Sequence, residues 1–283
     1  MCIRDRFSDI LVVPHALGQG LDYVEGEGPK LDPVRDRDAL GRLSGADIDA
    51  TLGPVYETVA RVRAALPAET ALIGFAGAPW TVATYMVEGG GSKDFALAKR
   101  FAYGDPDGFA RLIDLVVEAT IGYLRRQVDA GADAVKLFDS WAGVLPEAEF
   151  RRWVIAPTAR IVAALKQSHP AVPVIGFPRG AGFLYEAYLA ETGVDALAVD
   201  TALPLSVAKE LQGRRPVQGN LDPVALLVGG EALRRAAETI LAALSDGPFV
   251  FNLGHGVLQG TPPEHVADLA AQIRGWPGRG GGA

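Results

Sequence analysis

Polar side chains recur at or just after the short apolar runs of this sequence. They are Asp9, Tyr85, Ser140, Arg179 and His255. A carboxylate, a guanidinium, an imidazole and two hydroxyls can together bind anions, stabilise a cation and transfer protons. If the apolar runs are parallel strands, their carboxyl ends meet at one face, and we expect these side chains to share a site there.

Each of these residues also has a structural interpretation. Asp9 could cap a turn, Tyr85 could be a loop aromatic, and Ser140 could cap a helix. His255 lies between two glycines, which favours an exposed loop over a packed core position. Asp9 fits the pattern least well, because its apolar run directly follows the unrelated hexapeptide MCIRDR.

Other polar residues follow the same runs without suggesting a definite role. They are Asp139, Asp200, Thr201, Asn220, Asp222 and Asn252. We expect Asp222 to cap a helix because a proline follows it, and we expect His15, His169 and His265 to be structural or surface residues. The glycine-rich segments 26–31 and 88–95 lack the fingerprints of nucleotide-binding loops, so we predict mobile loops of an active site.

Seven short apolar runs alternate with longer stretches of helical period. Their continuous apolar character is typical of parallel strands covered on both faces. The predicted strands are Phe7–Val13, Ala71–Ala76, Ala134–Phe138, Val172–Phe177, Ala196–Asp200, Pro216–Asn220 and Phe249–Leu253.

Three helices between or after these strands have clear start signals. Asp105 and Asp222 each stand before a proline, as a capping residue does before the first helical position. Thr261 and Glu264 have the spacing of a capping box that opens the last helix. Repeated strand–helix units without a break in composition predict one α/β domain over residues 1–283.

A closed (β/α)8 TIM-like barrel needs eight strands, and only seven are visible. We therefore predict a barrel whose first strand is missing from this chain. Residues 1–6, MCIRDR, resemble no neighbouring element and are interpreted as a non-native scar. The glycine-rich residues 277–283 are expected to form a disordered tail.

Composition restricts the class of protein. The chain has 283 residues, of which 49% are hydrophobic and 22% charged, as in soluble globular proteins. It has no apolar run of about 20 residues that could span a membrane, and its net charge of −7 argues against a nucleic-acid partner. Cys2 is the single cysteine, which excludes an internal disulfide and a cysteine-based zinc site and favours the cytoplasm.

Several segments resemble the uroporphyrinogen decarboxylase family, in the order in which that family carries them. They are FSDILVVPHALG, GFAGAPWTVATYMVEGGGSKDF, KLFDSWAGVLP, GFPRGAG, VQGNLDP and FNLGHGVLQGTPPEHV, and they extend from Phe7 to about Val266. The resemblance implies a distorted (β/α)8 barrel that forms a homodimer and needs neither a metal nor an organic cofactor. It also implies decarboxylation of the four acetate side chains of uroporphyrinogen III, a tetrapyrrole, to give coproporphyrinogen III.

The resemblance also implies roles for individual residues. Asp9 matches the catalytic carboxylate, which would stabilise a protonated, cationic pyrrole that accepts the electrons left by CO2. Tyr85, Ser140 and His255 match positions that bind the substrate, mostly through its carboxylates. Arg179 is added from its chemistry alone, because a guanidinium suits a substrate with eight carboxylates.

One family feature is absent from this sequence. The family carries an RQAGR motif upstream of the FSDIL segment, and the arginines of that motif bind substrate carboxylates. Arg4 and Arg6 lie in the hexapeptide and are not taken as substitutes. Loss of these arginines can leave the chain as given inactive, or poorly stable with an open barrel seam, even where its parent gene encodes an active enzyme.

Two other functions remain open at this point. A metal- or corrinoid-dependent methyltransferase of the same barrel superfamily would need a thiolate or histidine-rich zinc site, which Cys2 alone does not supply. A tetrapyrrole carrier without activity would explain the missing arginines, but it would not need Asp9, Tyr85 and His255 together.

Overall fold

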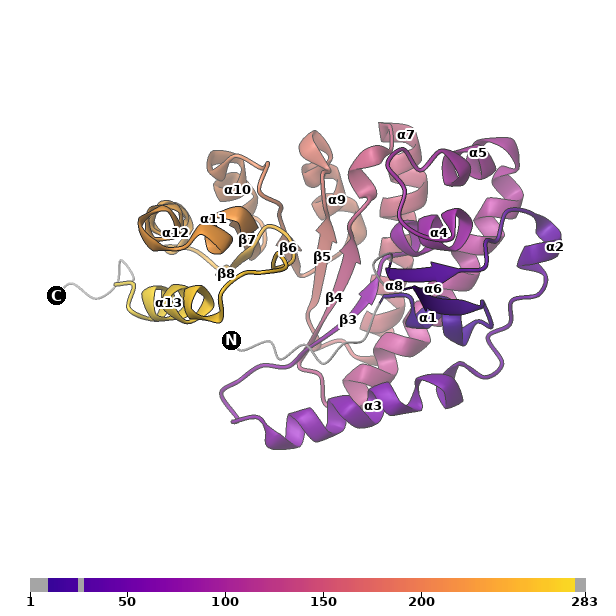
Figure 1. The fold of residues 1–283 in the computed structure, drawn as a ribbon, viewed down its shortest axis with the longest axis horizontal. Coiled ribbons are helices and arrows are strands. Elements are labelled where there is room, and N and C mark those ends of the chain that lie inside the picture. Colours follow the sequence, from indigo (N-terminus) through magenta and orange to yellow (C-terminus); the bar gives the residue numbers. More distant parts are fainter. Residues whose placement is uncertain (1–9, 25–27, 278–283) are drawn as a thin grey trace.

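A parallel sheet surrounded by helices forms the centre of the molecule in a computed structural model that describes residues 10–24 and 28–277 (Figure 1). The sheet has the order β3-β4-β5-β6-β7-β8, and every neighbouring pair is parallel. Its strands are β3 (Ile73–Gly77), β4 (Ala134–Asp139), β5 (Val174–Pro178), β6 (Ala196–Ala198), β7 (Val217–Leu221) and β8 (Phe249–Leu253).

The order of the strands follows the chain, because helices carry each strand back to the start of the next. Six of the seven predicted strands are confirmed. Within the described residues β3 and β8 do not pair, so hydrogen bonds do not close the barrel there.

The first predicted strand, Phe7–Val13, is wrong where the structure describes it. Ile10 and Leu11 lie in a turn, and helix α1 (Val12–Ala16) follows. Leu11, Pro14 and Leu17 are buried at a spacing of three residues, which puts them on one face of a helix rather than of a strand. The amide of His15 donates to the carbonyl of Leu11, as in a helical turn.

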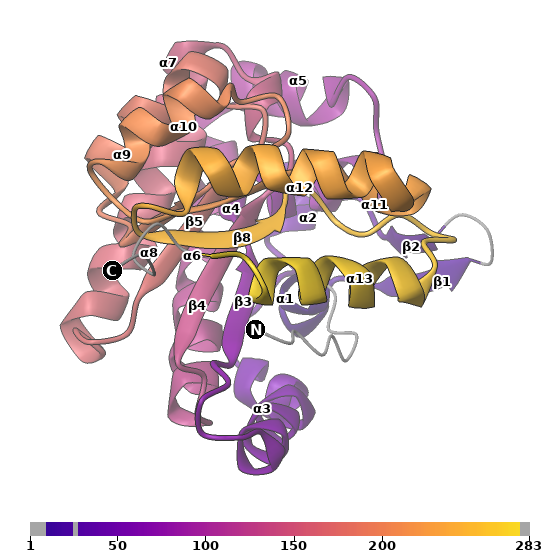
Figure 2. The same ribbon diagram turned by 90° about the vertical axis from the view of Figure 1, so that its left-hand side faces the viewer.

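Helices cover the outer surface of the sheet. Figure 2 shows α12 and α13 beside β8, whereas α3 lies at the far end of the molecule from α5 and α7 (Figure 1). The main helices are α3 (Ile48–Ala65), α4 (Pro79–Glu88), α5 (Ala96–Gly104), α6 (Pro106–Asp129), α8 (Ala156–Ser168), α9 (Tyr185–Thr192), α10 (Leu205–Gln212), α12 (Gly230–Leu244) and α13 (Pro263–Arg274). Shorter helical segments are α2 (Arg37–Leu40), α7 (Glu147–Phe150) and α11 (Pro223–Val228), with a π-helical turn at Arg151–Ile155.

Helix α6 shows how the apolar stripe in the sequence fixes the packing. Phe109, Leu112, Val116 and Leu124 are fully buried, and they recur at helical spacing on one face. Burying each such side chain stabilises the fold by about 1.5–3 kcal/mol. This face packs against α4 and α8 and belongs to one core that extends from Leu11 to Leu269.

Two of the three predicted helix caps are confirmed. Asp105 accepts a hydrogen bond from the amide of Gly108 at 3.0 Å, and Asp222 accepts one from Val224 at 2.8 Å. The capping box at Thr261 is wrong, although α13 does begin where it predicted. The Thr261 hydroxyl donates to the carbonyl of Leu258, because two successive prolines make Pro262 the capping residue.

The two glycine-rich segments differ: residues 28–31 form a strand, whereas residues 89–95 form the predicted loop between α4 and α5, and the predicted mobility stays a prediction. Residues 28–31 form strand β2 (Gly28–Leu31), which pairs with β1 (Leu21–Val24) in an antiparallel hairpin, so the loop prediction is wrong there. In segment 88–95 the Glu88 carboxylate accepts from the first amides of α5, and Phe95 is buried. Both segments are therefore held by specific contacts.

No helix in the described part of the chain is long and apolar enough to cross a membrane. Pro277 is the last described residue, so the predicted tail from residue 278 onward and the hexapeptide 1–6 lie outside the described residues. The division of residues 1–283 into a single domain stays a prediction.

Candidate active site at the carboxyl ends of the strands

Four of the five predicted site residues lie in the segments that follow strands, three of them in loops and one on a helix. Tyr85 lies on α4 just after β3, Ser140 directly follows β4, Arg179 directly follows β5, and His255 lies two residues beyond β8. Because the strands are parallel, all four residues belong to the same end of the sheet. Asp9 lies outside the described residues, so its position stays a prediction.

Asp200, which follows β6, organises the loops on this side of the sheet. Its buried carboxylate accepts hydrogen bonds from the Tyr185 hydroxyl at 2.8 Å, from the Gly180 amide at 2.5 Å and from the Ala202 amide at 2.9 Å. Burial raises the pKa of the Tyr185 hydroxyl, and the negative charge of Asp200 adds to that rise. Asp200 therefore fixes the loop that presents Arg179.

Arg179 and His255 face a shared electrostatic environment with Asp200. Partial burial of the His255 ring lowers its pKa, the positive charge of Arg179 lowers it further, and Asp200 acts in the opposite direction. The imidazole therefore favours its neutral form, which can both donate and accept a hydrogen bond. Gly254 allows the loop that carries His255 to lie against the backbone of Asp200 and Thr201. A Cβ at Gly254 would lie 2.5 Å from the backbone nitrogen of Thr201.

Arg179 has the properties of an anion-binding residue. Its guanidinium forms no ion pair with any described residue, and it lies 5.9 Å from the centre of the Trp141 ring. Its backbone is fixed on both sides, since its amide donates to the Asp139 carbonyl and its carbonyl accepts from Gly143. A fixed cation without an acidic partner suits the carboxylate of a ligand.

Aromatic rings form one wall beside Arg179. The Trp141 ring lies 6.4 Å from Tyr85 and 5.0 Å from Phe95 between ring centres. The Trp80 indole donates to the Trp141 carbonyl at 3.0 Å and holds it in place. Such a wall can pack against the flat, apolar part of a large ligand, while Arg179 binds acidic groups at its edge.

The buried Asp139 positions the loop that carries Ser140 and Trp141. The Thr81 hydroxyl donates to Asp139 at 2.5 Å and accepts from the Trp141 amide at 3.1 Å. Burial raises the pKa of the Asp139 carboxyl to about 7, and the hydrogen bond from Thr81 opposes the rise. The Ser140 hydroxyl forms no hydrogen bond with a described residue and can serve a ligand.

Sequence patterns assign no definite role to Asp139 and Asp200, and they do not single out Trp141. The available signal is that both aspartates stand at the end of a buried strand, where an unpaired charge is costly and needs partners. The sequence does not show that Thr81 and Tyr185 are those partners.

Three other polar residues singled out in the sequence have structural contacts or a surface position. The Asp222 carboxylate caps α11, and the Nδ1 atom of His265 pairs with the Leu226 carbonyl at 2.9 Å. His15 lies exposed on α1. Each therefore has a structural or surface place, as predicted.

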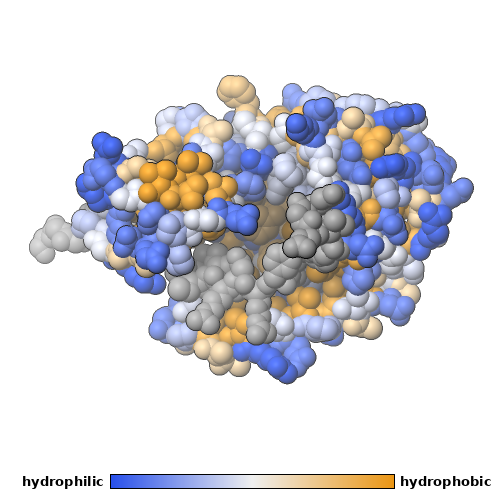
Figure 3. All heavy atoms as spheres, viewed as in Figure 1, coloured by the Kyte–Doolittle hydropathy of each residue, from blue (hydrophilic) through white to orange (hydrophobic). Residues whose placement is uncertain are grey.

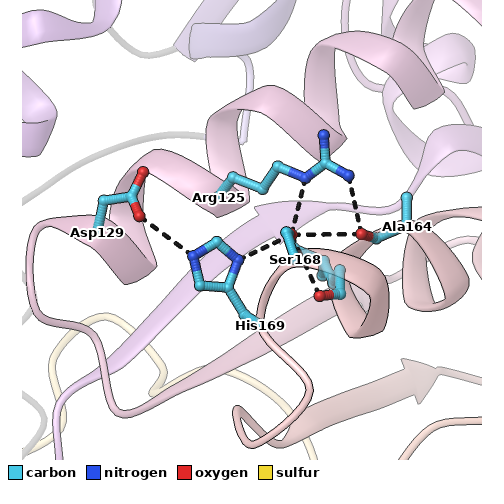
Figure 4. Close-up of polar contacts among 6 residues, drawn as sticks. Arg125, Asp129, Ala164, Ser168 and His169 are labelled. Atoms are coloured by element: carbon cyan, nitrogen blue, oxygen red, sulfur yellow. Dashed lines mark hydrogen bonds and ion pairs between the residues drawn. The ribbon is translucent and has the colours of Figure 1, made fainter.

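His169 belongs to a network at the opposite end of the sheet, where α8 leads into β5 (Figure 4). Its ring bonds to Asp129 at 3.1 Å and to Ser168 at 2.9 Å, and Arg125 donates to the Ser168 hydroxyl. The order Asp–His–Ser resembles that of a hydrolase triad. The Ser168 hydroxyl, however, receives a bond from Arg125 and bonds to carbonyls of its own helix, so the network joins the ends of α6 and α8 rather than activating a nucleophile.

Among the described residues, no group of three or more histidine, cysteine, aspartate or glutamate side chains could hold a metal ion. The methyltransferase alternative therefore finds no ligand cluster in the described part of the chain.

Comparisons of the fold show the architectural class. A methyltransferase from Methanosarcina mazei superposes with a TM-score of 0.78 at 21% identity, covering 93% of this chain and 77% of that one. A B12-independent methionine synthase from Shewanella sp. W3-18-1 superposes with a TM-score of 0.55 at 11% identity, covering 91% and 73%. At such identities the likeness concerns the fold alone, an α/β architecture of the TIM-barrel type.

Sequence comparison is more specific. The family model described as uroporphyrinogen decarboxylase matches residues 6–276. A uroporphyrinogen decarboxylase of Rhodospirillum rubrum is 54% identical over 269 residues, covering 95% of this chain and 77% of that protein. One of Chelativorans sp. is 53% identical, covering 95% and 78%. The chain belongs to the uroporphyrinogen decarboxylase family.

Proposed function

We propose that this chain converts uroporphyrinogen III to coproporphyrinogen III by removing the carboxyl groups of its four acetate side chains. The observation that carries the proposal is family membership over 95% of the chain at 54% identity. The candidate site supports it chemically, with an unpaired guanidinium, a histidine that favours its neutral form and an aromatic wall at the carboxyl ends of the strands.

Decarboxylation of an acetate on a pyrrole leaves an electron pair on the methylene carbon, so the reaction needs an electron acceptor. When the C–C bond to the carboxylate breaks, CO2 leaves, and the electron pair enters the ring if the ring has been protonated. A second proton then reaches the methylene carbon, which becomes a methyl group, and the ring releases the proton that it first received. We assign to Asp9 the stabilisation of the cationic ring, a type of interaction typically worth about 3–4 kcal/mol in the transition state.

Four further residues are assigned to substrate binding. Arg179 would pair with one substrate carboxylate, and Ser140 and His255 would donate hydrogen bonds to others. Tyr85, together with Trp141, would pack against the macrocycle. Since the protein carries a net charge of −7, these local donors must overcome a repulsive overall field. We further propose that the enzyme acts in the cytoplasm as a homodimer and without a cofactor.

The test is product analysis of the purified chain supplied with uroporphyrinogen III. We expect coproporphyrinogen to accumulate, detected as its oxidised porphyrin by liquid chromatography. Asp9→Ala should reduce kcat by a factor of at least about 100. Lys209→Met, which removes an exposed ion pair with Asp246 near the amino-terminal end of β8, serves as the control and should retain activity. Bound but unchanged uroporphyrinogen would instead identify a carrier.

A further inference from the structure

One ionisable side chain on the described strands β3 to β8 faces the interior enclosed by the sheet. Within strands β3 to β8, the titratable residues are Lys136 and Asp139, both on β4. They are three positions apart, so they point to opposite faces of the sheet. Asp139 faces Thr81 of α4, whereas Lys136 lies on the inner face and is only 6% exposed.

The Lys136 ammonium makes its contacts across the interior of the sheet. It donates to the Gln218 side chain of β7 at 2.6 Å, although β4 and β7 are not neighbouring strands. It also lies 4.6 Å from the centre of the Phe138 ring and 5.0 Å from that of Phe177. Ring faces attract cations, so these contacts favour the charged amine.

Lys136 forms no ion pair with a described carboxylate. Burial therefore lowers its pKa to about 7, so the ammonium gains or loses its proton near neutrality. The five strands other than β4 contribute no titratable side chain. Among the described residues, the charged or titratable groups at or directly after the carboxyl ends of the strands are Asp139, Arg179, Asp200, Asp222 and His255.

The residues that the Lys136 ammonium contacts show how far along the strands it lies. Phe138 pairs in register with Phe177, and Gln218 pairs with Ala198. Two residues further along the same strands, about 7 Å away, come Ser140, Arg179 and Asp200. The ammonium therefore lies one layer of side chains below the candidate active site.

The side chains of Lys136 and Gln218 both direct hydrogen-bond donors into the interior of the sheet. Lysine can only donate, so the Gln218 oxygen must face it. The Gln218 amide nitrogen is buried and has no hydrogen-bond partner in the described part of the chain. Both side chains thus direct positive potential into the interior, where low polarity strengthens its effect.

We infer that Lys136 and Gln218 form a buried cationic floor that raises the affinity of the site above it for the carboxylates of the substrate. The inference rests on the proposed function and adds to it a residue that acts through its charge, without touching the substrate. An anionic substrate would in turn favour protonation of Lys136, because an opposite charge nearby stabilises the ammonium. Substrate binding near pH 7 should therefore be accompanied by proton uptake.

The experiment compares the wild-type chain with Lys136→Met and Lys209→Met in uroporphyrinogen turnover at pH 6, 7 and 8. Lys209 lies on α10 in an exposed ion pair with Asp246, so its removal changes the net charge equally at a distance from the floor. Lys136→Met should raise KM about tenfold at pH 6 and leave kcat within twofold. Wild-type KM should rise from pH 6 to pH 8, and the variant should lose most of that rise.

A binding measurement makes the test independent of turnover. Calorimetry with uroporphyrin, the oxidised and unreactive macrocycle, in buffers of different ionisation enthalpy should show proton uptake by the wild type that Lys136→Met reduces. An unchanged KM in Lys136→Met, an equal change in Lys209→Met, or a loss confined to kcat would overturn the cationic floor alone. A wild-type chain that neither converts uroporphyrinogen nor binds uroporphyrin would instead overturn the proposed function, and the floor with it.

Discussion

Asp139 at the end of β4 and Asp200 after β6 are both buried, but they receive different sets of hydrogen bonds. Asp200 accepts three hydrogen bonds, from a hydroxyl and two backbone amides. The hydrogen bonds to Asp139 come from Thr81, and its second oxygen is buried without a partner among the described residues. Because burial disfavours the charged carboxylate and only Thr81 opposes this effect, the pKa of the Asp139 carboxyl is raised to about 7.

Asp139 should make the stability of the protein depend on pH. Its pKa is about 7 in the folded state, against an ordinary value of 3.8 for an exposed aspartate, so between these values the folded protein holds a proton that the unfolded chain releases. Stability should therefore fall as pH rises from about 4 to 7, at about 1.4 kcal/mol per unit of pKa difference. Asp139→Asn keeps an acceptor for Thr81 and removes the titration.

Urea denaturation of the wild type and of Asp139→Asn at pH 5 and pH 8 measures this effect. The free energy of unfolding of Asp139→Asn minus that of the wild type should be larger at pH 8 than at pH 5. A difference between the two proteins that does not change with pH would show that Asp139 does not titrate on unfolding in this range.

At the scale of elements, the sequence predicts best where one local signal decides the outcome. The strands from β3 to β8 could be predicted because parallel, fully buried strands are continuously apolar. The run from Ile10 to Val13 is just as apolar, but burial on one face at a spacing of three makes the region a helical turn. Apolar character alone does not separate these two cases.

The site could be predicted only in part for a related reason. Tyr85, Ser140, Arg179 and His255 follow strands, and that position is visible in the sequence. The supporting contacts of Asp139 and Asp200 join residues from different strand–helix units, as does the contact of Lys136 with Gln218. These pairings depend on the curvature of the sheet, which no short segment encodes.

Helix caps provide a prediction at this scale. Asp222→Ala should remove the hydrogen bond to the Val224 amide and destabilise the protein by about 1 kcal/mol. Thr261→Ala should change stability by a few tenths of a kcal/mol, because Thr261 does not cap α13. Thermal denaturation of both variants checks this contrast, and Asp222→Asn is the conservative control. Equal losses in the two alanine variants would contradict it.

At the scale of the whole molecule, local positive groups must act against an acidic protein. The net charge of −7 repels a substrate with several carboxylates, and the field becomes weaker with added salt. Arg179 at the site and Lys136 beneath it are placed where low polarity preserves their effect. The arrangement concentrates attraction at one end of the sheet while the surface stays acidic.

Exposed apolar side chains also gather around this end of the sheet. The Phe183 side chain, in a short 3-10 helical turn (Gly182–Leu184) after β5, is fully exposed, and Val257, in the loop after β8, is 60% exposed. Figure 3 shows a further apolar patch over α11 and α12, where Val228 is 62% exposed. A contiguous exposed apolar patch can mark a surface that binds another protein, whereas scattered exposed apolar residues are common, so the proposed homodimer needs a direct test.

The dimer can be tested through Phe183. A second copy that covers this ring would bury one of the largest apolar side chains on the surface, of the kind that contributes most to interfaces. Phe183→Ser should therefore shift the chain toward the monomer, by at least about tenfold in dissociation constant. Sedimentation equilibrium measures this, with Tyr103→Ser on α5, also exposed at 55%, as the control. A wild-type chain that stays monomeric at all concentrations, or a dimer that Phe183→Ser leaves intact, would show that this loop does not carry the interface.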